Sequence, residues 1–183
     1  MSTLTFPVLG LIALVAPIAG CGGSSAGAVD DSTPRTPLPA AIAGDWTASH
    51  GGTTQDCDPY GNCSYGDSTI EHLQLIADGT FDDETLIQQS AYGCQTKFLG
   101  HSVGTVVVNE QAGSLVLYLQ HTGVTSQDSC HAENNYERDS VSHDTWSYSF
   151  ETGTDPNTGH PALLLTAANG AADVFHPSSD FQQ

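Results

Sequence analysis

Cysteine is the residue type of this chain with the most chemistry to offer. There are five: Cys21 stands near the start, and Cys57, Cys63, Cys94 and Cys130 follow. In an exported protein an even number of cysteines predicts disulfides, and residues 1–20 predict export. Three pairings of the last four are open. We favour Cys57–Cys63, which closes a loop of turn-forming residues, together with Cys94–Cys130.

The eight histidines are His50, His72, His101, His121, His131, His143, His160 and His176. They form no His-x-His, no His-Glu-x-x-His and no Cys/His spacing typical of a zinc site. We interpret them as solvated loop residues and expect no metal. The alternative is metal capture by His121, His131 and His143, if neighbouring strand ends bring them together.

Two acidic segments have spacings that could serve acid/base catalysis or calcium binding. Asp78 and the run Asp82-Asp83-Glu84 contain paired carboxylates, which do acid/base work only where burial separates their pKa values. We expect a solvated face there instead. Residues 56–62 resemble the start of a calcium loop, but Tyr60 replaces a carboxylate and Asp67 the final glutamate. A disulfide-closed turn fits that segment better.

Catalytic motifs are missing from the sequence. No Gly-x-Ser-x-Gly, no phosphate-binding glycine loop and no nucleophile–His–Asp set can be recognised. We therefore expect a protein that is not an enzyme and needs no cofactor.

The charge balance narrows the partners. The formal net charge is −18, and the only basic side chains are Arg35, Lys97 and Arg138. Such a surface repels phosphate backbones, so we expect no nucleic-acid binding. It permits a basic protein partner or divalent cations.

The N-terminus carries an export signal. Phe6 to Ile18 is an apolar run too short to cross a bilayer, which takes about 20 residues, and it fits a signal peptide. It ends in Ile-Ala-Gly-Cys at 18–21, which resembles the bacterial lipobox. That resemblance implies removal of residues 1–20, lipidation of Cys21 and anchoring in a membrane. The alternative is an ordinary signal peptide cut after Ala28, which would discard Cys21.

The residue after the lipidated cysteine is Gly22, which is typical of outer-membrane export in Gram-negative bacteria. Residues 21–40 are rich in Gly, Ser and Pro, and we expect them to form a disordered, flexible linker. We expect a disordered tail at 178–183.

Hydrophobic alternation between these segments has a period of two, which is typical of strands. Residues 70–76 lead into Asp78-Gly79, and 163–165 run to Asn169-Gly170, both signals of two-residue type I′ hairpins. Another hairpin is expected around 110–113, and at most one short helical turn within 127–137. The sequence predicts an all-β domain over 41–177: an antiparallel meander of eight or nine strands that closes into a barrel.

Short motifs connect this domain to a known family. Gly44-Asp45-Trp46 matches the Gly-x-Trp that opens the first strand of lipocalins, and residues 76–81 resemble the Asp-Gly-Thr-Phe hairpin of bacterial lipocalin-like domains. The resemblance implies a lipocalin-like barrel. Lipocalins usually pack a late Arg against that Trp; here no Arg follows Arg138, and His176 is the only cation-capable residue of the last strand.

Function follows only as an expectation. We expect a lipid-anchored envelope protein whose barrel binds a small apolar ligand or a protein partner. The candidate ligand-binding residues are Trp46, Trp146, Tyr148 and Phe150, the last three sharing one strand face. The alternatives are a filled structural barrel, since small barrels can fill with side chains, a metal-binding lipoprotein, and an inhibitor of a basic enzyme.

Overall fold

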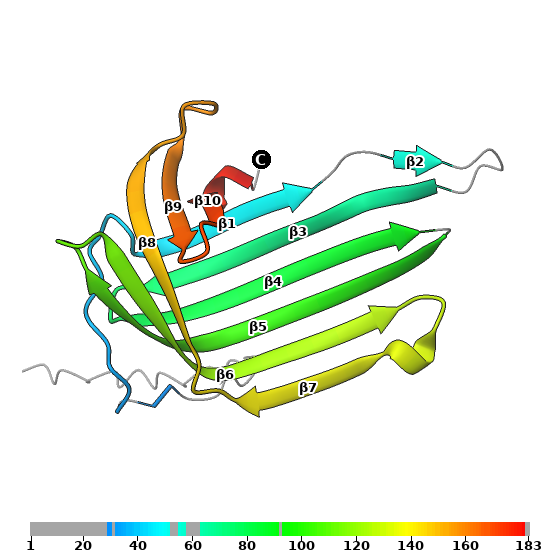
Figure 1. The fold of residues 1–183 in the computed structure, drawn as a ribbon, viewed down its shortest axis with the longest axis horizontal. Coiled ribbons are helices and arrows are strands. Elements are labelled where there is room, and N and C mark those ends of the chain that lie inside the picture. Colours follow the sequence, from blue (N-terminus) through cyan, green and yellow to red (C-terminus); the bar gives the residue numbers. More distant parts are fainter. Residues whose placement is uncertain (1–28, 31, 52–54, 58–62, 92, 182–183) are drawn as a thin grey trace, which may run out of the picture.

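The protein is a closed barrel from which a sheet extends to one side (Figure 1). The computed structural model describes residues 29–30, 32–51, 55–57, 63–91 and 93–181, with the backbone alone at 55–57, 63–67 and 181. The strands are β1 Gly44–Gly51, β2 Gln55–Cys57, β3 Cys63–Ile76, β4 Thr80–Ala91, β5 Cys94–Asn109, β6 Ser114–Asp128, β7 Tyr136–Val141, β8 Thr145–Thr154, β9 Pro161–Ala167 and β10 Ala172–Pro177. Two short 3₁₀ helices, η1 Ala132–Asn134 and η2 Ser178–Phe181, complete the described elements.

Eight antiparallel strands form the ring. Each of β3, β4, β5, β6, β8, β9 and β10 pairs with the next, and β1 closes the ring by pairing with both β10 and β3. The predicted all-β meander barrel is confirmed, with β2 and β7 added outside the ring. The short turn expected within 127–137 is η1.

The strands β3 to β6 run past the ring, where β2 pairs with β3 and β7 pairs with β6. We call this part of the sheet the extension (Figure 1). β7 and β8 pair with successive parts of β6, and residues Ser142–Asp144 between them belong to neither strand. This break lets β8 leave the extension and close the barrel.

The hairpins lie at the predicted positions, but the prediction of two-residue type I′ turns at Asp78-Gly79 and Asn169-Gly170 was wrong. Ile76 pairs with Thr80, and Leu163 with Phe175, so both loops have three residues with a left-handed glycine last, Gly79 and Gly170. A two-residue loop would shift each register by one and turn Phe81 and Phe175 out of the core. Core packing therefore selects the longer loop.

The N-terminal segment corrects the predicted linker. Thr36 N donates to Val106 O at 2.9 Å, and Leu38 N donates to Ala77 O at 3.0 Å. Leu38 and Ile42 are buried in the core, so residues 32–40 cover one end of the barrel. The Pro-rich composition predicted a flexible linker because composition alone does not show that Leu38 and Ile42 are placed to enter the core.

A bulge in β6 holds the same segment. The register slips between Val103 and Gly104, which leaves Gln120 as the extra residue. The buried Gln120 side chain accepts a hydrogen bond from Asp30 N and donates to Asp30 O at 3.0 Å and to Thr33 Oγ1 at 2.6 Å. The part of the predicted linker that is described is thus ordered.

The predicted disordered tail is also wrong over 178–181. These residues form η2, where Ser178 Oγ hydrogen-bonds Thr47 Oγ1 at 2.8 Å, and Asp180 Oδ2 lies 2.9 Å from His160 Nδ1. The tail packs because two of its polar side chains meet partners on the barrel.

Candidate functional site

The barrel interior is filled at the end that the N-terminal segment covers. We call this the closed end; its buried side chains form one cluster that includes Ile42, Trp46, Leu75, Phe81, Val106, Leu115, Leu163 and Phe175. Trp46 is 8 % exposed, and its Nε1 donates to Ile42 O at 2.8 Å. The closed end leaves no room for a ligand against Trp46.

The opposite end of the barrel, which opens toward the extension, is acidic. We call it the mouth. On β3 the inward residues Leu75 and Leu73 are followed by Glu71, and on β4 Phe81 is followed by Asp83. On β10, Asp173 precedes Phe175. Ring closure through β1, which pairs with both β10 and β3, brings these strands to one end of the barrel, so three carboxylates line one small cavity.

Asp83 is the most unusual of the three. It is only 5 % exposed, and its Oδ1 atom has no hydrogen-bond partner among the described residues. Burial, and then the charge of Glu71, raise the pKa of Asp83 from 3.8 to about 7. The group is therefore protonated or close to half-ionised at neutral pH.

Glu71 shares this environment. It lies diagonally across the β3–β4 pair from Asp83, and both side chains line the same cavity. Burial first, then the charge of Asp173, raise the pKa of Glu71. The charge of Glu71 is in turn one of the causes that raise the pKa of Asp83.

Asp173 has a partner at the rim. Its Oδ1 atom lies 2.8 Å from His50 Nε2 on β1, with both side chains well exposed. Within the described residues, no Lys or Arg lines the mouth. His50 is thus the cation-capable group that the chain provides at this end.

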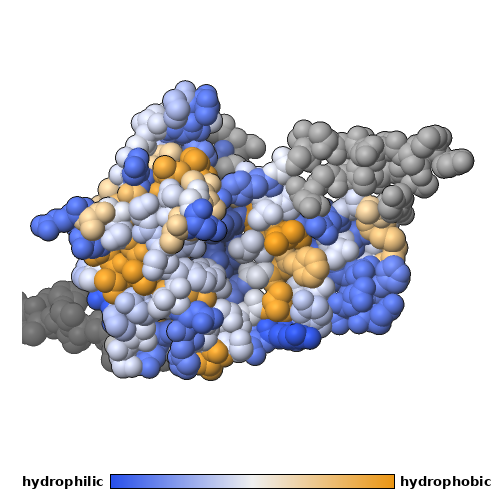
Figure 2. Space-filling model, in the orientation of Figure 1, coloured by the Kyte–Doolittle hydropathy of each residue, from blue (hydrophilic) through white to orange (hydrophobic). Residues whose placement is uncertain are grey.

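An aromatic wall faces the carboxylates. Trp146 and Tyr148 on β8 line both an inner cavity of about 70 Å³, shared with Glu71, Asp83 and Asp173, and an outer hollow of about 400 Å³. Burial and the three carboxylates raise the pKa of Tyr148 to about 12, so its hydroxyl stays neutral. Figure 2 shows a hydrophilic recess between β8 and the extension on this face.

The predicted ligand-binding residues separate into two groups. Trp146, Tyr148 and Phe150 all pack against the core cluster, but of these only Trp146 and Tyr148 are among the residues that line the mouth cavity, and Trp46 belongs to the closed end. His176, the cation-capable residue of the last strand, lies next to Trp46 along the sheet but points to the other face, where its Nε2 is 3.4 Å from Asp155 Oδ2.

The interpretation of residues 82–84 as one solvated face was wrong for Asp83. Asp82 and Glu84 do face outward, and Asp82 Oδ1 lies 3.0 Å from His101 Nε2. Asp83 alternates with them and follows Phe81 into the barrel. The run of three acids concealed this alternation; the signal that reveals it is Phe81-x-Asp83 opposite Leu73-x-Leu75.

The histidines do not cluster. His50, His101, His131, His160 and His176 each lie near a different aspartate. Among the described residues, no group of three or more His, Cys, Asp or Glu side chains is placed to hold a metal ion. The grouping of His121, His131 and His143 that the metal alternative requires does not form there.

The outer face of the extension carries a broader groove of about 610 Å³, lined by His101, His121 and Asp139 among others. Of the described residues, Asp83 alone has a buried side-chain atom without a partner, so this groove shows no comparable unmet polar group. The mouth is the stronger candidate.

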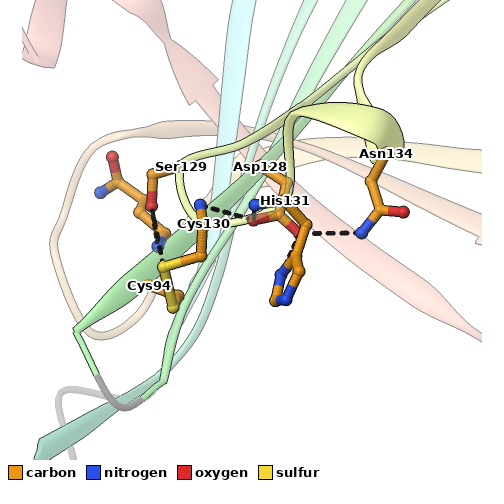
Figure 3. The surroundings of a disulfide bond; sticks show 7 residues. Cys94, Asp128, Ser129, Cys130, His131 and Asn134 are labelled. Carbon is orange, nitrogen blue, oxygen red and sulfur yellow. Dashed lines mark hydrogen bonds and ion pairs between the residues drawn. A yellow bond between two sulfur atoms is a disulfide. The ribbon is translucent and has the colours of Figure 1, made fainter.

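One predicted disulfide is confirmed. Cys94 and Cys130 are bonded across the end of the extension, with their Cα atoms 5.6 Å apart. Figure 3 shows the turn beside it, where Asp128 accepts hydrogen bonds from the backbone of Cys130 and His131 and from Asn134 Nδ2. Cys57 and Cys63 are paired in the β2–β3 register, but a bond between them lies outside the described side chains.

The remaining predictions for the N-terminal half concern residues outside the described ones: the signal peptide, Cys21 and most of the calcium-like segment. Of the residues that are described, none belongs to a helix long and apolar enough to cross a membrane.

The comparisons with known proteins add no family. No family model matches the chain, and no curated protein sequence matches it either.

Proposed function

We propose that this protein is a non-enzymatic binding protein of the cell envelope, held at the outer membrane by a lipid on Cys21. The Ile-Ala-Gly-Cys sequence at 18–21 behind an apolar run supports the anchor. The described residues begin at 29, so only a short stretch of sequence separates Cys21 from the part of the chain that packs on the barrel. The charge of −18 supports a role that involves neither nucleic acid nor anionic lipid surfaces.

The ligand binds at the mouth and not deep inside the barrel. The single observation that carries this proposal is the buried carboxyl of Asp83, which lines the cavity with an oxygen atom that no described residue satisfies. Leaving a buried polar atom unpaired costs about 1–3 kcal/mol. A buried polar atom without a partner calls for an explanation, and a ligand that supplies the missing partner is the one proposed here.

The filled closed end favours a second candidate, a purely structural barrel. The core cluster occupies the interior that a classical apolar ligand would use. The two candidates differ at the mouth only, because a structural barrel has no need of an inward-facing carboxylate beside a hollow.

A fragment screen by NMR decides between them. The chain has two tryptophans, and their indole N–H signals report on opposite ends of the barrel. A mixture of neutral, cationic and anionic fragments should shift the Trp146 signal and leave the Trp46 signal unchanged, because Trp46 is hydrogen-bonded inside the core. If no fragment at millimolar concentration moves the Trp146 signal, the structural barrel is the better description.

The anchor is tested separately in cells. Labelling with radioactive palmitate should mark the wild type, and Cys21→Ser should lose both the label and the membrane fraction. An unlabelled wild type would instead favour the ordinary signal peptide cut after Ala28.

A further inference from the structure

We infer that the ligand of the mouth is a small protonated amine with an apolar or aromatic body. Its ammonium group binds beside Asp83 and Glu71, and its body lies against Trp146 and Tyr148. This inference rests on the proposed binding function and assigns the chemical class of its ligand.

Charge is the first argument. Three carboxyl groups converge on a cavity whose described lining contains no Lys or Arg, and His50 reaches only the rim, on Asp173. Neighbouring carboxyl groups oppose each other's ionisation. No Lys or Arg among the described lining residues offsets their negative charge. An ammonium group supplies both a positive charge and hydrogen-bond donors.

The unsatisfied oxygen of Asp83 is the second, independent argument. Asp83 lines the inner cavity and is more than nine-tenths buried, and its Oδ1 atom has no hydrogen-bond partner among the described residues. A purely apolar ligand would cover it and leave it unpaired, which disfavours binding. An anionic ligand would also leave this oxygen without a donor, and the carboxylates of the mouth would repel it.

Shape sets the size of the ligand. The inner cavity of about 70 Å³ holds about two water molecules at about 30 Å³ each, which is the size of a primary ammonium head and its first methylene. The outer hollow of about 400 Å³ accepts a ring or short chain. Trp146 and Tyr148 line both spaces and offer aromatic faces to a cation and to its apolar body.

A metal ion fits less well. In the described part of the chain no three acidic or imidazole side chains are placed at coordinating positions, and two walls of the cavity are aromatic or aliphatic, including Leu73 and Leu165. Divalent cations require several oxygen ligands at short range. The mouth is better suited to a cation that carries an apolar portion.

Binding at neutral pH has a proton balance. The groups around Asp83 are Glu71 beside it, Asp82 and Glu84 on its own strand, Asp173 across the cavity and Tyr148 on the wall; His50 lies behind Asp173. The arriving ammonium favours the ionised form of Asp83, which displaces the proton that Asp83 holds. That proton leaves to solvent, so uptake of the amine is accompanied by proton release.

Calorimetry with three matched probes tests the inference. 2-Phenylethylamine, 2-phenylethanol and phenylacetate share a ring and differ in charge. At pH 7 the amine should bind, and the alcohol and the acid should bind at least about tenfold more weakly, since a charge-assisted bond is lost. Repeating the amine titration in buffers with different ionisation heats should show proton release.

Two variants locate the effect. Asp83→Asn should weaken the amine at least about tenfold, whereas Asp82→Asn, the same change one residue away on the outer face, should leave its affinity unchanged. If Asp83→Asn does not fold, Glu71→Gln provides the second variant, with the same expected loss.

The outcomes separate the two proposals. Alcohol or acid bound as tightly as the amine, or amine binding unaltered by Asp83→Asn, overturns the amine inference and leaves a binding mouth. Zinc or calcium that displaces the amine also overturns it. If none of the probes and no fragment affects Trp146, the binding function itself fails.

Discussion

The two ends of this barrel are built from the same strands and differ in what their inward residues do. On three strands the inward side chain changes from apolar to acidic over two positions: Leu73 to Glu71, Phe81 to Asp83, and Phe175 to Asp173. The apolar member of each pair is buried in the core cluster, and the acidic member lines the mouth. Core packing and the acidic lining of the mouth are therefore placed two residues apart on one face of each strand.

The largest difference is expected when the closed end is opened. Phe81 is 1 % exposed, so Phe81→Ala should leave a cavity and lower the free energy of unfolding by about 3–5 kcal/mol. Phe98 is a half-buried residue of β5 in the extension. Phe98→Ala is therefore the matched control and should lower the free energy of unfolding clearly less. Urea unfolding monitored by circular dichroism measures both; equal losses would mean that the closed end is not the stabilising half.

The next effect concerns Asp83 in the mouth, where a substitution should raise the free energy of unfolding at high pH. The pKa of Asp83 is raised in the folded protein from 3.8 to about 7, so the folded state holds the proton more tightly than the unfolded chain. Stability from this group is therefore fully present below about pH 4 and is lost as the pH rises to about 7. Three pKa units at about 1.4 kcal/mol each correspond to about 4 kcal/mol.

Asp83→Asn removes this dependence. At pH 8 the variant should be more stable than the wild type by up to about 4 kcal/mol, and the advantage should shrink toward pH 4. The difference between the two unfolding profiles isolates the group, because all other titrating residues are shared. A wild type that is at least as stable as the variant at pH 8 would contradict the account of the mouth.

A smaller effect is expected on the outer face. Asp82 and His101 form a half-exposed pair at 3.0 Å, and such pairs contribute about 0–1 kcal/mol. Asp82→Asn should therefore change the free energy of unfolding by less than about 1 kcal/mol at pH 6. A larger loss would show that the outer face, and not only the mouth, depends on its carboxylates.

The subtlest expected difference is in access to the two indoles. In Trp46→Phe the remaining Trp146 faces the acidic mouth, so caesium should quench its fluorescence more strongly than iodide at equal ionic strength. In Trp146→Phe the remaining Trp46 should resist both ions because it is buried. Equal quenching by the two ions in the first variant would show that the mouth carries no net negative field.

Much of the fold could be predicted from the sequence, because the evidence is local. Alternation in residues 70–76 and 145–150 places strands and inward faces, and Asp78-Gly79 and Asn169-Gly170 mark the hairpins. The turn types could not be predicted from these pairs alone, since they are decided by which register buries Phe81 and Phe175. That decision depends on the packed barrel.

The site was less accessible to sequence reasoning. Trp146 and Tyr148 were predicted on their aromatic alternation, but the carboxylates come from β3, β4 and β10 and meet only because the ring closes. Asp83 lay within an acidic run that looks uniformly solvated. The N-terminal segment was misread for a related reason: its hydrogen bonds go to Val106 and Ala77, far away in the chain.

The most direct test of the central claim is the titration of the Asp83 carboxyl itself, followed by carbon NMR in protein labelled at aspartate. The account requires a buried carboxyl in a cavity whose described lining contains no Lys or Arg, so its signal should titrate with a midpoint near pH 7. The Asp82 signal, recorded in the same spectra, serves as the reference for an outward-facing neighbour. An Asp83 midpoint near pH 4, the ordinary value for a solvated aspartate, would mean that the mouth is not the buried, unsatisfied acidic site described above.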